Sequence, residues 1–221
     1  MLFSSLKKDV KKVNKKSLEI RTATMQDLDD ILKVEALAWP EGLRATKEMF
    51  VSRIRVFPEG QFVCLVNGDM EGICCTQRMD YDFSKPLSSW IGVTDCGFIK
   101  GTHDLNGEYL YGVNLSVVSN MAMFKVADKL LDACEEYIVK NNLRGGILGA
   151  RIPRYHKHVE EFPNPWDYVN KKIGSRYRDP EIQFYSRHKL NPLCILPSYF
   201  HDPDSLHNGV LLLFKNSERG D

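Results

Sequence analysis

The sequence predicts a single α/β domain built on a mixed sheet, and three observations indicate this. Strand-like and helical apolar segments alternate along the chain. The turn Asn67-Gly68-Asp69 separates two apolar runs, which predicts an antiparallel hairpin. Residues 109–152 read as strand, helix and strand, and a right-handed crossover makes such strands parallel. No internal repeat or linker divides residues 18–221.

The N-terminal part is expected to run from a strand into two helices. Residues 18–24 (LEIRTAT) alternate apolar and polar side chains, as in a half-buried strand. Thr24 suits the N-cap of a helix over 25–39, because the first turn of that helix is acidic. A second helix over 45–57 ends at Pro58-Glu59-Gly60.

The middle of the chain contains the hairpin and a long insertion. The hairpin strands are expected at 61–67 and 70–79. Residues 80–108 are rich in turn formers, and the short run CGFIKG (96–101) predicts one extra edge strand there. Residues 109–118 (YLYGVNLSVV) then form the most hydrophobic of the strands up to that point.

The C-terminal part begins with a helix over 122–141, closed by Arg144-Gly145-Gly146. The next strand, 146–152, is expected to lie parallel to the strand 109–118. Residues 153–178 form a polar and aromatic excursion that is too long for a simple connection, so we expect it to face a substrate or partner. A last helix and two strands follow, at 179–188, 190–197 and 209–214.

Residues 1–17 form a basic leader or a short helix, with six lysines among residues 6–16. A basic patch for nucleic acid or acidic lipid remains the alternative, although interleaved aromatic residues are missing. The whole chain has 30 basic and 29 acidic residues, so no global field attracts nucleic acid or a membrane. Because no apolar run reaches roughly 20 residues and no signal peptide is evident, we expect a cytoplasmic protein with no nucleic acid or membrane partner.

The six cysteines show no C-x-x-C spacing and lie mostly in apolar runs, so we interpret them as buried small hydrophobes. A cysteine nucleophile with a histidine partner stays open. The segment His156-Lys157-His158 is the best argument for a metal, but a lysine between histidines in a basic loop favours a solvated turn. We therefore expect no metal site.

The turn between the strand 109–118 and the following helix is a candidate anion site. A helix N-terminus leaves backbone N–H groups unpaired and carries partial positive charge. Ser119 and Asn120 let the chain turn, and Lys125 adds a cation to the first turn. The site suits a phosphate or pyrophosphate, although many such turns bind nothing.

The order of elements over roughly residues 18–215 resembles the GNAT superfamily of acyl-CoA-dependent N-acyltransferases. The segments AWPEG (38–42), SRIRVFPEGQFVC (52–64) and GARIPRY (149–155) resemble the GNAT domain that some bacterial proteins carry fused to carbon-nitrogen hydrolases. The resemblance continues from GARIPRY to the C-terminus. It implies a mixed, mostly antiparallel sheet with flanking helices and a central parallel pair of splayed strands.

The resemblance also implies acetyl-CoA or another acyl-CoA as co-substrate, with no metal. The family's pyrophosphate loop, Q/R-x-x-G-x-G/A, corresponds here to residues 122–127, of which only the last small residue fits. A backbone N–H of the strand before it stabilises the oxyanion. The implied cofactor-binding residues are Leu115, Ser116, Val117, Ala122, Met123, Phe124, Lys125, Val126 and Ala127.

The family mechanism is direct attack of an acceptor amine on the thioester. It assigns Tyr185 to protonate the leaving thiolate, unless this residue is only a core tyrosine. Glu108, His103 or a water chain is the candidate base. Trp39, Arg151 and Tyr155 are candidates to bind the substrate, whereas packing is favoured for Trp166.

The implied acceptor is an amine on a small molecule or a peptide, and a homodimer is possible. The alternative is a non-catalytic GNAT-like module that binds acyl-CoA or serves as an interaction domain. The missing loop glycines favour this alternative.

Overall fold

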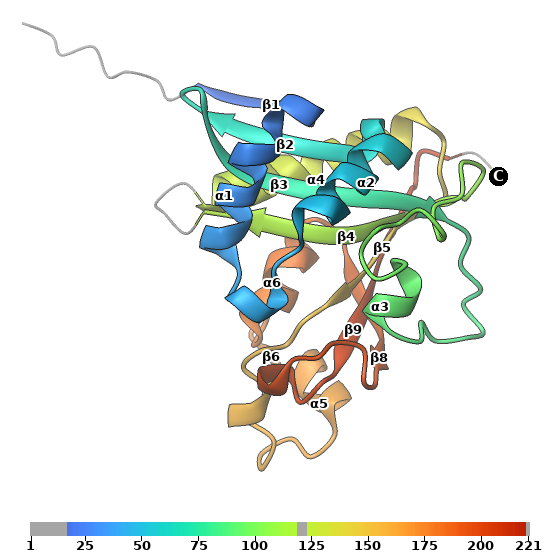
Figure 1. Cartoon of the computed structure of the whole chain (residues 1–221). Helices are drawn as coiled ribbons and strands as arrows, with labels where there is room; N and C mark the ends of the chain where they lie inside the picture. The colour runs from blue at the N-terminus through green and yellow to red at the C-terminus, as the bar shows by residue number, and fades with distance from the viewer. Residues whose placement is uncertain (1–16, 119–122, 220–221) are drawn as a thin grey trace, which may run out of the picture.

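The computed structural model describes residues 17–118 and 123–219. A seven-stranded sheet in the order β1-β2-β3-β4-β5-β9-β8 organises the fold (Figure 1). Among the described strands of this sheet, β4 and β5 alone pair in parallel. The expected mixed, mostly antiparallel sheet with a central parallel pair is confirmed. Residues 1–16 of the expected basic leader (1–17) and Ala122 of the phosphate loop lie outside the described residues.

The N-terminal strand and helices form as expected. The strand β1 (Leu18–Thr22) leads through a 3-10 turn, η1 (Met25–Asp27), into α1 (Leu28–Ala38), and α2 (Lys47–Val56) follows η2 (Glu41–Leu43). The Asp27 carboxylate accepts hydrogen bonds from the backbone N–H and hydroxyl of Thr24, which fixes the start of this helical segment. The hydrogen bond from Arg21, together with those from Thr24, lowers the pKa of Asp27 to about 2.

The predicted hairpin is present as β2 (Gln61–Val66) and β3 (Asp69–Met79), which follow η3 (Pro58–Gly60). Asn67 and Gly68 have φ angles of 56° and 94°. Positive φ at both central positions makes a turn whose twist matches that of the strands.

The prediction of an extra edge strand at residues 96–101 is wrong. Residues 80–108 instead contain a one-turn helix, α3 (Trp90–Val93), and a series of turns. Cys96, Gly97 and Ile99 have positive φ angles, which an extended strand excludes. Ile99 of this run is fully buried, but it reaches the core from a turn and not from a strand.

The expected crossover is formed by β4 (Tyr109–Val117), α4 (Met123–Lys140) and β5 (Gly145–Ala150). The helix α4 packs on one face of the sheet, where Val126 and Leu130 contact Cys74. The helices α1 and α2 cover the other face (Figure 1), where Cys75 faces the α2 residue Arg53. Alternate residues of β3 therefore point to opposite layers.

The excursion over 153–178 contains η4 (Tyr155–Lys157), α5 (Pro165–Asn170) and a small hairpin of β6 (Lys172–Ile173) and β7 (Arg176–Tyr177). The helix α6 (Pro180–Arg187) and the strand β8 (Asn191–Leu196) follow, and η5 (Pro203–Ser205) precedes β9 (Gly209–Lys215). The strand β8 forms the edge of the sheet, and β9 lies between β5 and β8. In Figure 1, β5, β9 and β8 turn steeply away from the direction of β1–β4.

Candidate functional site

The site begins where the two parallel strands separate. Residues Tyr109–Gly112 of β4 pair with Gly145–Leu148 of β5, but β4 continues to Val117 without β5 beside it. Gly112 lies opposite Thr76 and Asn114 lies opposite Cys75, so Val113 is an extra residue that forms a bulge. Its carbonyl oxygen accepts a hydrogen bond of 3.0 Å from Trp90 Nε1. The bulge bends β4 away from β5, and the expected splay of the parallel pair is confirmed.

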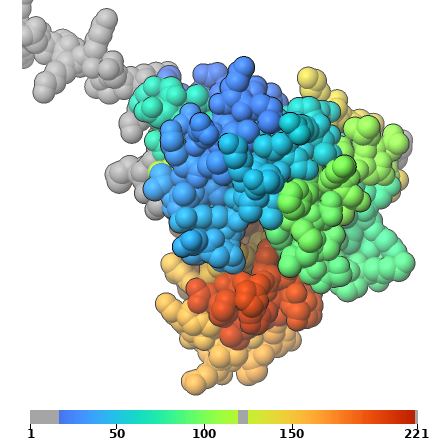
Figure 2. All heavy atoms as spheres, viewed as in Figure 1, coloured from blue at the N-terminus to red at the C-terminus, as the bar shows by residue number. Residues whose placement is uncertain are grey.

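A cleft of about 1430 Å³ occupies the gap between the strands. Its walls come from both faces of the sheet, with Trp39 and Met49 on the α1–α2 side and Ala127 and Leu131 on the α4 side. Figure 2 shows a hollow where the blue N-terminal helices, the green insertion and the red C-terminal segment meet. The cleft passes through the sheet, so two ligands that enter from opposite faces can meet inside it.

One wall of the cleft is organised by Glu35 of α1, which is only 2% exposed. Its Oε1 accepts a hydrogen bond of 2.7 Å from the backbone N–H of Ala45. Its Oε2 accepts from the Ser116 hydroxyl at 2.6 Å and from Asn114 Nδ2 at 3.1 Å. Trp39 Nε1 donates in turn to the Ser116 hydroxyl at 2.7 Å. Both oxygens of Glu35 are therefore engaged, and they fix the free end of β4 to α1.

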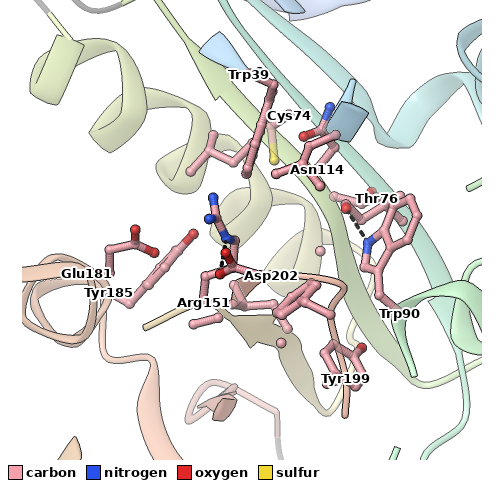
Figure 3. Close-up of a pocket in the computed structure, with 18 of the residues that line it drawn as sticks. Trp39, Cys74, Thr76, Trp90, Asn114, Arg151, Glu181, Tyr185, Tyr199 and Asp202 are labelled. Carbon is pink, nitrogen blue, oxygen red and sulfur yellow. Dashed lines mark hydrogen bonds and ion pairs between the residues drawn. The ribbon is translucent and has the colours of Figure 1, made fainter. Parts of the chain in front are cut away.

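The opposite wall carries a cation, Arg151, directly after β5. Its Nε donates a hydrogen bond of 2.8 Å to Asp202 Oδ2, and its guanidinium carbon lies 5.3 Å from the Trp39 ring centroid. Burial raises the pKa of Asp202, but the hydrogen bonds from Arg151 and Ser205 outweigh burial and lower it below its usual value. In the part of the chain that the structure describes, the two Nη atoms of Arg151 have no acceptor. Figure 3 shows them directed into the cleft toward Trp39.

Two titratable residues of α6 lie beside this arginine. Glu181 and Tyr185 are one helical turn apart and both line the cleft (Figure 3). No described residue forms a hydrogen bond with the Tyr185 hydroxyl or with the Glu181 carboxyl group. Burial, then Asp179, raises the pKa of Glu181 to about 7, while Arg151 opposes the shift. Burial, then Glu181, raises the pKa of Tyr185.

The helix α6 is held in this position by its N-cap. The carboxylate of Asp179 accepts hydrogen bonds from the backbone N–H groups of Glu181 and Ile182 at 2.9 and 3.0 Å. Its second oxygen accepts from the Tyr168 hydroxyl at 2.8 Å, so the long excursion supports the helix that carries Glu181 and Tyr185.

Other residues predicted from the sequence lie elsewhere. Glu108 precedes β4 and forms ion pairs of 2.6 Å with Arg144 and 2.7 Å with Arg219, which lower its pKa, with Arg219 as the larger cause. Tyr155 is 2% exposed, and its hydroxyl donates to backbone carbonyl groups of the excursion. His103 stacks on Phe57 at a centroid distance of 4.4 Å. None of Glu108, Tyr155 and His103 lines the cleft.

The residues expected to bind the cofactor divide between two environments. Leu115, Val117 and Ala127 line the cleft, whereas the Ser116 side chain is turned toward Glu35. Val126 is fully buried against β3, and Lys125 is exposed at the start of α4. Met123 and Phe124 begin α4.

Sequence reasoning missed Glu35 and Glu181. Glu35 follows Leu28 and Ile31 on the apolar stripe of α1, and a carboxylate at such a position indicates a buried polar contact. Glu181 had no comparable pattern, because acidic residues are ordinary in the first turn of a helix.

Comparisons with known proteins address the fold and the family. No protein-family model matches the chain. An uncharacterized N-acetyltransferase, YkwB of Bacillus subtilis, is 29% identical over 204 residues, which cover 90% of this chain and 89% of YkwB. A probable hydrolase, YhcX of the same organism, is 29% identical over 187 residues, 85% of this chain. The match spans only 36% of YhcX.

Two solved structures superpose over nearly the whole chain. The loading GNATL domain of CurA from Lyngbya majuscula has a TM-score of 0.77 at 22% identity, covering 90% of this chain and 98% of the other. The chain has the GNAT fold. The GphF GNAT-like decarboxylase in complex with isobutyryl-CoA has a TM-score of 0.73 at 25% identity, covering 89% and 98%. The resemblance to GNAT N-acyltransferases predicted from the sequence is thereby confirmed.

Two further features of the GNAT domain concern metals and membranes. Across residues 17–118 and 123–219, no group of three or more His, Cys, Asp or Glu side chains is arranged to hold a metal ion. Within the same ranges, none of the helices has the length and apolar character needed to cross a bilayer.

Proposed function

We propose that this protein is an acyl-CoA-dependent N-acyltransferase that moves an acetyl or other acyl group to an amine. The observation that carries the proposal is the cleft between the splayed strands, because it joins the two faces of the sheet at the β4 bulge. The similarity to YkwB, which is named an N-acetyltransferase, supports the reaction class.

The acyl-CoA enters from the α4 side in this proposal, where Ala127, Leu131 and Cys134 give an apolar wall for the pantetheine arm. The thioester then lies beside the part of β4 that β5 has left. Backbone N–H groups there have no strand partner on the β5 side, and they are available to the oxyanion. The acceptor enters from the α1–α2 side, past Trp39.

Tyr185 is the proposed acid for the leaving thiolate. Its hydroxyl group faces the cleft, and its raised pKa keeps it protonated before the reaction. The departing thiolate accepts the Tyr185 proton as the hydroxyl takes one from the nitrogen of the tetrahedral intermediate, so no free tyrosinate forms, and proton transfer from a placed donor accelerates the departure.

Binding of acetyl-CoA and of free CoA tests the proposal before any acceptor is known. A ligand that binds only the native state at about one hundred times its Kd adds about 2.7 kcal/mol to the free energy of unfolding. We expect a concentration-dependent rise in Tm with either ligand. An unchanged Tm at millimolar acetyl-CoA removes the enzyme assignment.

Lys125→Glu tests where the pyrophosphate binds. The lysine is exposed at the first turn of α4, so its replacement by a carboxylate puts a negative charge at the positive end of the helix dipole, which reduces the positive potential there and repels the phosphates. We expect it to abolish the shift by acetyl-CoA, whereas Lys140→Glu in the last turn of the same helix leaves the shift intact. An unchanged shift in Lys125→Glu places the phosphates elsewhere.

A second candidate function is decarboxylation of an acyl-CoA whose acyl chain carries a carboxylate. It is favoured by the 25% identity to a GNAT-like decarboxylase and by the free guanidinium nitrogens of Arg151. Release of CO₂ from malonyl-CoA in the absence of any amine distinguishes this reaction from N-acyl transfer. A non-catalytic acyl-CoA-binding module would release neither CO₂ nor CoA thiol.

A further inference from the structure

Arg151 and Glu181 are opposite charges that share the cleft without forming an ion pair with each other. Both side chains line the cleft, and Figure 3 shows them on the same side of it, with Tyr185 beside them. Within the described part of the chain, the ion pair of Arg151 is with Asp202, at 2.8 Å, through Nε. The guanidinium is thus oriented by Asp202 while its Nη side remains open to a ligand.

Glu181 is surrounded by charges, but none of them bonds to it directly. Asp179 at the N-cap of α6 and Asp202 of the C-terminal segment disfavour its ionised form, whereas Arg151 and Arg154 favour that form. On its own helix, Tyr185 is its cleft-facing neighbour. Burial, then Asp179, raises the pKa of this carboxyl group to about 7, so it can exchange a proton inside the cleft near neutral pH.

Glu35, another carboxylate that lines the cleft, lacks this freedom. Its oxygens already accept three hydrogen bonds, from Ala45, Asn114 and Ser116. These contacts hold β4 to α1, so Glu35 is a positioning residue. Glu181 differs from Glu35 because it can receive a proton without loss of a hydrogen bond to a described residue.

We propose that the acceptor is a small zwitterion that carries an amine and a carboxylate, bound between Arg151 and Glu181. This inference rests on the proposed N-acyltransferase function. The acceptor carboxylate binds the free Nη atoms of Arg151, where a planar guanidinium makes two parallel hydrogen bonds. The Trp39 ring, 5.3 Å from the guanidinium carbon, holds that plane from one side.

Every proton released or taken up in the proposed reaction has a named donor and acceptor. The acceptor arrives as R–NH₃⁺ and gives one proton to the Glu181 carboxylate. The free amine attacks the thioester carbon, the C–N bond forms, and the C–S bond breaks as the tetrahedral intermediate collapses. The thiolate takes one proton from Tyr185, which regains it from the new C–N nitrogen. One hydrogen stays on the amide, and Glu181 returns its proton to solvent.

The proposal is tested with acetyl-CoA and matched pairs of acceptors. Each amino acid is compared with the amine that lacks its carboxyl group: glycine with methylamine, β-alanine with ethylamine, and 4-aminobutyrate with propylamine. The protein amino acids extend the panel. The release of CoA thiol is measured, and the acylated product is identified by mass spectrometry. We expect an amino acid of the panel to be acylated while the paired amine, which lacks the carboxyl group, does not react.

Variants then connect the carboxylate preference to Arg151. Arg151→Lys keeps the charge and the contact with Asp202 but loses the planar fork. We expect KM for the amino acid to rise roughly tenfold or more, with kcat changed less. Arg176→Gln, an exposed arginine of β7, serves as the control and leaves KM unchanged. Tm of each variant shows that it is folded.

Three results overturn the proposal. Equal acylation of plain amines removes the carboxylate requirement but leaves the N-acyltransferase in place. CO₂ release from malonyl-CoA without an amine assigns Arg151 to the acyl chain instead of the acceptor. Acetyl-CoA binding with no amino acid acylated also rejects the zwitterion. Failure of acetyl-CoA to bind is a separate result, because it rejects the proposed function itself.

Discussion

The two walls of the cleft differ in how far their polar groups are satisfied by the protein. On the α1–β4 wall, Glu35, Asn114, Ser116 and Trp39 form one closed hydrogen-bond network. On the β5–α6 wall, Glu181 and Tyr185 have no hydrogen-bond partner among the described residues. Both groups face the cleft, and polar groups that the protein leaves unpaired there are expected where a ligand or a reaction uses them.

The comparison assigns different tasks to the two walls. The satisfied wall holds the bulged strand β4 rigid, so that backbone groups beside the thioester keep their positions. The unsatisfied wall keeps groups available for proton transfer and for binding an anion. Variants of the two walls should accordingly fail in different measurements.

Tyr185→Phe is expected to give the largest effect. It removes the proposed proton donor but keeps the ring that packs in the cleft. General acid catalysis contributes about 10²–10⁴-fold, so we expect kcat to fall by that order while the acetyl-CoA shift in Tm is retained. Steady-state thiol release measures kcat. Activity close to that of the native protein would mean that Tyr185 is a core tyrosine.

Glu35→Ala tests the satisfied wall. The substitution leaves the Ser116 hydroxyl, the Asn114 amide and the Ala45 N–H without their acceptor. A buried donor that loses its acceptor costs about 1–3 kcal/mol. We therefore expect the free energy of unfolding to fall by about 3 kcal/mol. Urea denaturation measures it. Glu41→Gln, an exposed control, should stay within about 0.5 kcal/mol, and an equally small loss in Glu35→Ala contradicts the network.

Glu181→Gln tests the unsatisfied wall through the pH dependence of stability. The pKa of Glu181 is raised in the folded state, from 4.5 to about 7. Its protonation therefore stabilises the fold below pH 4.5, and this contribution is lost as pH rises through about 7. The shift corresponds to about 3 kcal/mol.

We expect the native protein to lose Tm between pH 5 and 8 relative to Glu181→Gln, which has no proton to lose. Glu160→Gln, an exposed control, should follow the native protein at every pH. Parallel pH profiles for the native protein and Glu181→Gln would show that the Glu181 carboxyl group is solvated like an ordinary surface residue, and the two walls would then not differ in this respect.

Most of the fold could be predicted from the sequence, because local patterns are sufficient for it. The Asn67-Gly68 turn fixed the hairpin register, and the apolar periods of residues 109–152 predicted the crossover. The exception was the run 96–101, where positive φ angles replaced an expected strand. A six-residue run is too short for its apolar content to distinguish a strand from packed turns.

The site was only partly predictable. Trp39, Arg151 and Tyr185 were named from the sequence, and the structure brings all three to one cleft. Glu108 was named as well, and the structure pairs it with Arg144 and Arg219 outside that cleft. Glu181 was passed over, although it lies beside Arg151 and Tyr185.

The sequence by itself determined the elements, their order and the parallel crossover, since these depend on side-chain periodicity and turn residues close together along the chain. Only the tertiary structure decided which charges remain unpaired. Arg151 and Glu181 are separated in the sequence by the long excursion over residues 153–178. Glu35 and Ser116, which form a hydrogen bond, are 81 residues apart in the sequence. Pairing between such distant groups depends on how β4 and β5 separate and on how Asp179 anchors α6, and no local pattern encodes those distances.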